Sequence, residues 1–223
     1  MDLGISGKKA LVCASSKGLG FGCAAALAHA GVDLTMCARN EKQLLAAAKN
    51  IRKIGVSVKI VVCDITTETG IEKVLESIPN PDILINNAGG PPPGTWQDWT
   101  NEHFLSAINA NMLTPIKLIQ SVLPSMIKKK WGRIVNITSG AVKAPIPALG
   151  LSNSARAGLT GFVAGVSRQV AKDGVCINNV LPGVHDTDRI KAFDETSARD
   201  LNITVGEARK IKAASIPVGH YGN

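Results

Sequence analysis

A short stretch near the amino terminus carries the residue types that bind a phosphate group. Residues 15–20 read Ser-Ser-Lys-Gly-Leu-Gly, and they lie between an apolar run at 10–14 and an Ala- and Leu-rich run at 23–30. The two runs predict a buried strand and a helix, and a glycine-bearing turn between such elements is typical of pyrophosphate sites built from backbone N–H groups. Gly18 and Gly20 also suit close packing of the helix on the strand, so this stretch alone leaves both interpretations open.

The elements that must position this turn alternate along the whole chain. Short apolar runs rich in β-branched residues alternate with helical runs, which predicts a parallel sheet with right-handed crossovers. We therefore expect an α/β fold, a Rossmann-like doubly wound parallel sheet flanked by helices on both faces, in one domain over residues 1–223. Strands are expected at 10–14, 34–38, 57–63, 83–86, 133–138 and 175–181, and helices at 20–30, 41–54, 68–77, 114–129 (the second half of a long helix split near Asn111) and 151–173.

Composition excludes several classes of function. The net charge is +8, but Lys128–Lys130 is the only basic run and aromatic residues make up 4%, so we predict no nucleic-acid partner; a positive field suits a phosphate-bearing cofactor instead. No apolar run reaches the roughly 18–20 residues of a membrane span, and residues 1–4 lack the pattern of a signal peptide. The five cysteines include no C-x-x-C pair. We predict a cytoplasmic protein with reduced cysteines, no membrane partner and no metal site.

Four motifs follow one another along the chain. Residues 13–20 resemble T-G-x-x-x-G-x-G, although Cys13 stands in the Thr position and Ala14 in the first Gly position. The extra methyl of Ala14 predicts weaker cofactor affinity. The other three motifs are N-N-A-G at 86–89, G-R-I-V-N-I-T-S at 132–139 and P-G-x-x-x-T at 182–187. In their order and spacing, the four motifs resemble those of the short-chain dehydrogenase/reductase family, and within it the 3-oxoacyl-carrier-protein-reductase-like branch.

The resemblance, which covers essentially the whole chain, implies a dinucleotide lying across the carboxyl ends of the strands. Asp64 follows the third predicted strand, where the family places an acid against the adenine amine; a loop-capping Asp is the alternative. The implied contacts are Ser15, Ser16, Lys17, Gly18, Leu19 and Gly20 to the pyrophosphate and adenosine ribose, Asn87, Ala88 and Gly89 on the ribose and adenine side, and Pro182, Gly183, Val184 and Thr187 beside the nicotinamide.

The end of the second predicted strand indicates which nicotinamide cofactor fits. A ribose 2′-hydroxyl needs an acidic acceptor there, whereas a 2′-phosphate needs cations. The strand ends at Ala38-Arg39-Asn40 without Asp or Glu, and Lys17 lies in the turn beside it. Because a guanidinium binds phosphate through two parallel hydrogen bonds, we predict NADP(H) rather than NAD(H).

The resemblance also implies the catalytic residues, and here the chain departs from the family. Ser139 matches the Ser that polarises the carbonyl and Asn111 the Asn that holds a water. The Tyr and Lys that lie one helical turn apart are replaced by Ser152 and Arg156, and the chain's only tyrosine is Tyr221. An alkyl hydroxyl is a far weaker acid than a phenol, and arginine is not deprotonated in proteins. Losing a positioned general acid costs typically about 10² to 10⁴ in rate.

Several residues are candidates for the missing roles. Arg156 is predicted to bind the cofactor ribose or a substrate oxygen as a fixed cation, so it counts as both a catalytic and a cofactor-binding candidate. A water held by Asn111 and Ser152, or His185 in the loop after Pro182, are the candidate proton donors; an ordinary loop residue is the alternative for His185.

Two functions follow. The first is an NADP(H)-dependent oxidoreductase that transfers hydride to a small-molecule carbonyl, such as a 3-oxoacyl thioester, or from the matching alcohol. The alternative is a catalytically silent NADP(H)-binding sensor or scaffold of the same fold. Trp96, Trp99 and residues 188–214, a substrate-side helical segment, are predicted to shape the pocket, with surface packing as the alternative for the tryptophans.

The family pattern also bears on assembly. The family's last helix and seventh strand have no counterpart in the chain, so we expect the last strand to be missing. A homodimer or homotetramer is expected through the long helices at 114–129 and 151–173.

Overall fold

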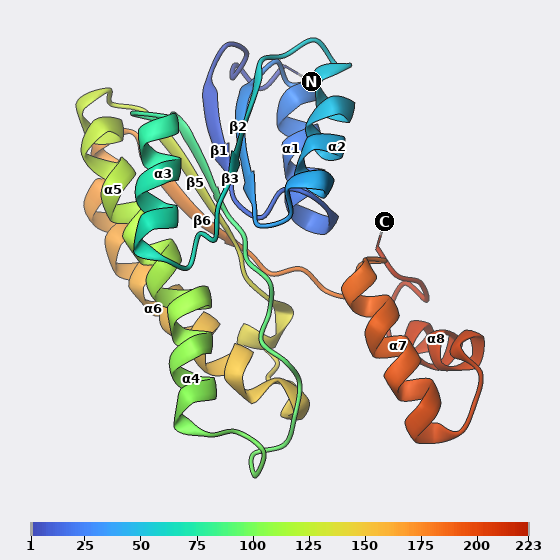
Figure 1. Ribbon diagram of the computed structural model, residues 1–223. Helices are drawn as coiled ribbons and strands as arrows, with labels where there is room; N and C mark the ends of the chain where they lie inside the picture. Colours follow the sequence, from blue (N-terminus) through green and yellow to red (C-terminus); the bar gives the residue numbers. More distant parts are fainter. Residues whose placement is uncertain (1, 223) are drawn as a thin grey trace. The chain divides into compact units, whose positions relative to one another are not determined.

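The computed structural model describes residues 2–222, and its centre is a six-stranded parallel sheet with the strand order β3-β2-β1-β4-β5-β6. This order confirms the predicted doubly wound α/β fold (Figure 1). The direction of strand order reverses between β1 and β4, which is where such folds bind their ligands, outside the carboxyl ends of the strands. The strands are β1 (Lys9–Val12), β2 (Asp33–Ala38), β3 (Val58–Val62), β4 (Ile83–Asn86), β5 (Gly132–Ile137) and β6 (Val175–Val180).

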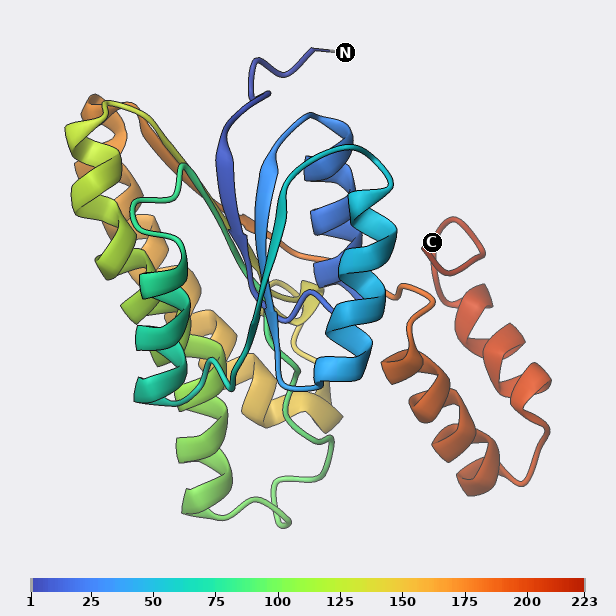
Figure 2. The ribbon, with the colours of Figure 1, turned by 45° about the horizontal axis from the view of Figure 1, so that its top comes forward.

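Helices cover both faces of the sheet (Figures 1 and 2). On one face, α1 and α2 pack over a core that includes Val12, Met36 and Leu44; on the other, α3, α5 and α6 pack over a core that includes Leu11, Leu84 and Ile134. Because successive strand residues point to opposite faces, Leu11 and Val12 enter different cores. The helices are α1 (Gly18–His29), α2 (Glu41–Arg52), α3 (Glu68–Ser77), α4 (Asn101–Ile108), α5 (Thr114–Lys128), α6 (Gly150–Val170), α7 (Asp188–Leu201) and α8 (Val205–Ala214).

The predicted split of the long helix near Asn111 is confirmed, and its form is a π-helical turn. Residues Asn109–Leu113 form this turn between α4 and α5. Such bulges insert an extra residue into a helix and are frequent at functional sites. Asn111 is buried at this point, with 4% of its surface exposed.

The contacts of the described chain form two compact units, one ending at Leu181 and one beginning at Pro182. One domain over the whole chain therefore stays a prediction. The second unit holds α7 and α8, which both lie within the predicted helical segment 188–214. The place of this segment beside a substrate stays a prediction. The buried Asp194 of α7 is paired with Arg209, and Tyr221 donates to the same carboxylate.

No helix among residues 2–222 combines the length and the apolar character that crossing a membrane requires.

Candidate active site

The glycine-bearing turn after β1 is tightly packed. Ala14 has a left-handed backbone with φ of 46°, and Gly18 has φ of 57°. A Cβ on Gly20 would lie 2.3 Å from the carbonyl oxygen of Ala14 and 2.7 Å from Nδ2 of Asn87. Asn87 Nδ2 donates to the carbonyls of Ala14 (3.2 Å) and Cys13 (3.4 Å). Gly20 therefore serves close packing, because only a residue without a side chain lets α1 begin against the turn. Gly18 is exposed, so the start of the helix stays open to a ligand.

The start of α1 has the donor set that a pyrophosphate needs. Lys17 precedes the helix in an extended conformation, and the first turn of α1 contains no acidic residue. The unpaired N–H groups of a first helical turn and its positive dipole end favour an anion. Ser15 differs from its neighbours, because it is fully buried, its hydroxyl donates to the carbonyl of Val12 (2.9 Å) and its N–H to the carbonyl of Cys37 (3.1 Å). The residues of this turn fit a dinucleotide, with Ser16, Lys17, Gly18 and Leu19 at its surface and Ser15 inside.

Arg39 and Asp64 face each other beyond the ends of β2 and β3. The guanidinium of Arg39 is 80% exposed and lies 3.8 Å from Oδ2 of Asp64. The other carboxylate oxygen of Asp64 accepts from the N–H and hydroxyl of Thr66, at 2.9 and 2.8 Å. Desolvation by burial acts to raise the pKa of Asp64, but the Thr66 hydrogen bonds and Arg39 outweigh it and lower that pKa. Asp64 thus caps its loop and also pairs with the cation that we predict to bind a 2′-phosphate.

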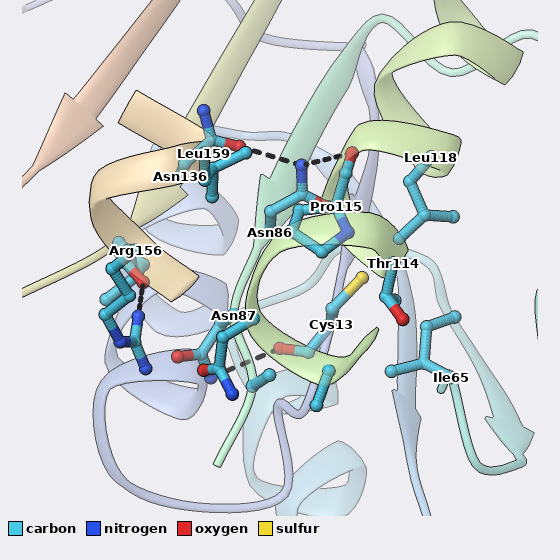
Figure 3. Close-up of a pocket in the computed structure, with 14 residues that line it drawn as sticks. Cys13, Ile65, Asn86, Asn87, Thr114, Pro115, Leu118, Asn136, Arg156 and Leu159 are labelled. Atoms are coloured by element: carbon cyan, nitrogen blue, oxygen red, sulfur yellow. Dashed lines mark hydrogen bonds between the residues drawn. The ribbon is translucent and has the colours of Figure 1, made fainter. Parts of the chain in front are cut away.

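A row of asparagines crosses the sheet near the switch point. Asn86 Nδ2 donates to Asn136 Oδ1 at 2.8 Å (Figure 3), and Asn136 Nδ2 donates to Asn179 Oδ1 at 2.9 Å. The parallel register places the three residues opposite one another on β4, β5 and β6. Sequence reasoning missed this row as a unit, although Asn86 and Asn136 lie inside the motifs at 86–89 and 132–139.

A small, partly open cavity of about 20 Å³ lies beside this row and is lined in part by the π-helical turn. Three buried acceptors at its wall have no partner in the described chain: Asn86 Oδ1, Asn111 Oδ1 and Thr114 Oγ1. Each of these residues is 4% exposed, and Asn111 Nδ2 donates to the carbonyl of Ala107 (3.4 Å). Buried polar atoms of this kind are ordinarily satisfied by an internal water, which needs about this much space. Thr114 carried no sequence signal for this role.

Arg156, on α6, reaches the end of β5 from the same side. Its Nη1 donates to the carbonyls of Ile137 (2.8 Å) and Thr138 (3.1 Å), and its Nε donates to the hydroxyl of Ser152 (3.1 Å). Arg156 lines the cavity (Figure 3) and is 7% exposed, while Ser152 is 6% exposed. The two residues in the Tyr and Lys positions are thus bonded to each other, and the guanidinium holds the last residues of β5 against α6.

Ser139 directly follows Thr138, just beyond the end of β5. Its hydroxyl oxygen accepts from the N–H of Ala141 (3.1 Å), at the start of a short 3₁₀ turn, Gly140–Val142. Ser139, Asn111, Ser152 and Arg156 all belong to the first unit, on elements that meet at the carboxyl end of β5. The hydroxyl groups of Ser139 and Ser152 each accept one bond from the protein, so the proton of each is its remaining donor.

The other predicted site residues lie in different places. Asn87 anchors the turn, Ala88 is half-buried and Gly89 exposed. Pro182, Gly183, Val184 and Thr187 belong to the second unit, so their contact with a nicotinamide stays a prediction. His185 belongs there too, and its backbone pairs with Gly222 in an isolated bridge.

Tyr221, also in the second unit, is engaged elsewhere. Its hydroxyl donates to Asp194 Oδ1 at 2.9 Å. Burial and the hydrogen bond to Asp194 raise the pKa of Tyr221 to about 12. A phenol with that pKa and that partner is a poor proton donor near neutral pH.

A doubly wound parallel sheet with a glycine-bearing turn at its switch point, and a cavity lined by Asn111 and Arg156 beside that turn, defines a nucleotide-binding fold. The family model for the short chain dehydrogenase matches residues 8–198. The chain belongs to the short-chain dehydrogenase/reductase family, whose fold binds a nicotinamide cofactor.

Relatives and solved structures agree with this assignment. The 3-oxoacyl-acyl-carrier-protein reductase FabG of Vibrio cholerae is 31% identical over 227 residues, covering 99% of this chain and 86% of the relative. The L-sorbose reductase of Gluconobacter frateurii, complexed with NADPH and L-sorbose, has a TM-score of 0.93 at 27% identity, covering 100% of this chain and 87% of that one. An actinorhodin polyketide ketoreductase with NADPH has a TM-score of 0.89 at 28% identity, over 96% and 85% of the two chains.

Proposed function

We propose that this protein is an NADP(H)-dependent oxidoreductase that reduces the carbonyl of a small molecule, such as a 3-oxoacyl thioester, or oxidises the matching alcohol. The single observation that carries the proposal is the state of two hydroxyl groups. Ser139 accepts a bond from Ala141 N–H and Ser152 accepts one from Arg156, so each has its own proton left for a substrate oxygen. Hydrogen-bond donors at a carbonyl oxygen stabilise the negative charge that develops there during hydride transfer, and the proposal assigns this role to the two hydroxyl groups.

The choice of NADP(H) rests on the cations at the adenosine end. Arg39 presents an exposed guanidinium beyond β2, and Lys17 precedes α1. The solved relatives at 27% and 28% identity were complexed with NADPH, which supports the same choice. When bound, the cofactor supplies the hydride.

Arg156 takes over part of the role of the family's Lys. Its charge lies one hydrogen bond from the Ser152 oxygen, and a cation at this distance favours negative charge on that oxygen. The proton itself comes, in this proposal, from a water at the cavity wall, where Asn111 Oδ1 and Thr114 Oγ1 are unpaired. Because a water is a poorer acid than a positioned phenol, we expect turnover roughly 10² to 10⁴ slower than a Tyr-bearing site would give.

The test is NADPH oxidation with a panel of 3-oxoacyl thioesters, diketones and keto esters. The unmodified protein is compared with Ser139→Ala and with the double variant Ser152→Tyr, Arg156→Lys. The proposal expects slow turnover by the unmodified protein, a large loss in Ser139→Ala and unchanged NADPH affinity in that variant. Equal turnover in Ser139→Ala contradicts the assigned role of Ser139.

A second function, a silent NADP(H)-binding sensor or scaffold, is favoured by a specific observation. The Arg156 guanidinium points to main-chain carbonyls inside the protein and Ser152 is 6% exposed, which suits a structural lock. This alternative expects NADPH binding without oxidation of any panel member. Activity confined to the Ser152→Tyr, Arg156→Lys variant supports it, because the cofactor cleft is then intact and the chemistry has been removed.

Assembly through the long helices is part of the proposal. The outer face of α6 is exposed at Ala157, Gly161 and Gly165, one turn apart, and nothing lies within 4 Å of a Cβ placed on either glycine. Small residues in this pattern let two helices approach closely. Light scattering of Gly161→Glu against the unmodified protein tests this, with a shift toward the monomer expected.

A further inference from the structure

Two loops of the first unit meet beside the predicted substrate site. The loop after β4 runs from Asn87 to Thr100, and the loop after β5 runs from Thr138 to Leu149. The N–H of Gly94 donates to the carbonyl of Ala148 at 3.0 Å, which joins the two loops directly.

The indole of Trp99 fills the space between these loops and α6. A Cβ on Gly150 would lie 2.2 Å from Cζ3 and 2.5 Å from Cη2 of the indole, and a Cβ on Gly94 would lie 2.8 Å from its Nε1. The ring also contacts Phe104 edge to face, with centroids 6.3 Å apart and planes at 82°. One glycine on each side thus provides the space that the ring occupies, and Phe104 limits its rotation.

The contact at Gly150 places Trp99 close to the catalytic candidates. Gly150 is the first residue of α6, and Ser152 follows in the same helical turn. Asn153 Nδ2 donates to the carbonyl of Ile146 (2.9 Å), so the first turn of α6 also holds the loop that leads back to Ser139. A shift of the indole therefore moves the start of α6 and the loop after β5 together.

We propose that Trp99 is a positioning residue, which sets where α6 begins and how far apart the two loops lie, and thereby places Ser152 relative to Ser139. The catalytic part of this inference rests on the proposed function. Trp96 makes a useful contrast, because it lies three residues earlier in the same loop and is 79% exposed. The two tryptophans therefore differ. Trp96 is a surface residue, as the packing alternative expects, whereas Trp99 lies between the two loops.

A double-mutant cycle tests the wedge without any turnover. Gly150→Ala alone is expected to lower the unfolding temperature, since its methyl group collides with the indole. In a Trp99→Ala background the same change is expected to be neutral or stabilising, because the space is vacant and Ala is the better helix former. Additive effects of the two changes overturn the proposal. Should Trp99→Ala fail to fold, Trp99→Leu serves in the cycle, because it also lacks the ring atoms that face Gly150; the indole Nε1 has no partner in the described chain, so this change removes no hydrogen bond.

Hydrogen exchange and kinetics test the positioning role. Trp99→Ala is expected to speed exchange of the Gly94 amide and of the first turn of α6, and to leave β1–β3 unchanged; Trp96→Ala is expected to leave all of these as in the unmodified protein. Unchanged exchange at Gly94 and α6 overturns the proposal. With a 3-oxoacyl thioester, Trp99→Ala is expected to lower kcat about tenfold and raise KM, with unchanged NADPH affinity and recovery of kcat in Trp99→Phe.

The kinetic arm is run in the unmodified protein and in the Ser152→Tyr, Arg156→Lys background. A kcat that does not respond to Trp99→Ala in a background with turnover overturns the positioning role. Failure of the proposed function has a different signature, which is absence of turnover in both backgrounds. The unfolding cycle and the exchange data then still decide whether Trp99 sets the start of α6.

Discussion

The turn after β1 and the start of α6 both depart from the family's sequence pattern, the first in backbone conformation and the second in side-chain chemistry. At the turn, Ala14 stands where the family has glycine and adopts the left-handed backbone that glycine favours, with φ of 46°. The backbone of the turn bears the strain of this conformation. At α6, Ser152 and Arg156 sit without backbone strain and form a buried hydrogen-bonded pair, but their acid–base chemistry differs from that of Tyr and Lys. The turn thus departs from the family pattern in backbone strain, and the start of α6 departs from it in acid–base chemistry.

The largest effect is expected at Arg156, where substitution tests how much the buried pair at the start of α6 contributes to stability. Arg156→Ala leaves the Ile137 and Thr138 carbonyls without their donor at a buried position, so we expect a loss of about 3 kcal/mol in the free energy of unfolding. Arg156→Lys retains a cation but not the fork, and a smaller loss is expected. Urea unfolding measures both. Equal stability of all three proteins would show that the guanidinium does not hold β5 to α6.

Gly20→Ala is the corresponding test of the turn. Its methyl group would meet the Ala14 carbonyl and Asn87, so we expect destabilisation by about 2 kcal/mol and weaker NADPH binding. Gly22→Ala is the matched control in the same helix, since nothing lies within 4 Å of its Cβ; helix propensity alone predicts a gain of about 0.5–1 kcal/mol there. Thermal unfolding and NADPH titration are measured for both variants. Equal unfolding temperatures and NADPH affinities of the two variants would contradict tight packing at Gly20.

Arg39→Ala tests whether this residue selects NADPH over NADH by binding the 2′-phosphate. We expect NADPH affinity to fall about tenfold, near 1.4 kcal/mol, while NADH affinity stays the same. Isothermal titration with both cofactors measures the ratio. A parallel loss for NADH would assign Arg39 to the fold or to Asp64 rather than to the 2′-phosphate.

The smallest effect is expected at Ala14. Ala14→Gly relieves the left-handed strain but increases the entropy of the unfolded chain, and the net gain is about 0.5 kcal/mol. NADPH affinity is expected to rise because the methyl group leaves the turn. A loss of stability would mean that the methyl group contributes packing that outweighs its strain.

Most elements of the fold could be predicted from the sequence, because buried parallel strands are continuous apolar runs. The bounds of β4 and α3 agree with the prediction, and the other strands of the sheet begin or end within one or two residues of it. Within the predicted helical segment 188–214, the bounds of α7 were not distinct in the sequence, because this polar helix buries little apart from Asp194 and Ala198. The direction of Arg156 was also beyond sequence reasoning, because it depends on how α6 lies against the end of β5. The orphaned acceptors of Asn86 and Thr114 arise only once α5 and β4 are packed together.

The single tyrosine allows unfolding of the second unit to be followed by absorbance, because its phenol ionises at different pH in the folded and unfolded states. Tyr221 belongs to the second unit and all three tryptophans to the first. The pKa of Tyr221 is raised to about 12 in the folded state and is about 10 in an unfolded chain. The stability that this phenol contributes is therefore complete below pH 10 and is lost as the pH rises toward 12. At pH 11, tyrosinate absorbance near the ultraviolet edge should report unfolding of the second unit while tryptophan emission follows the first.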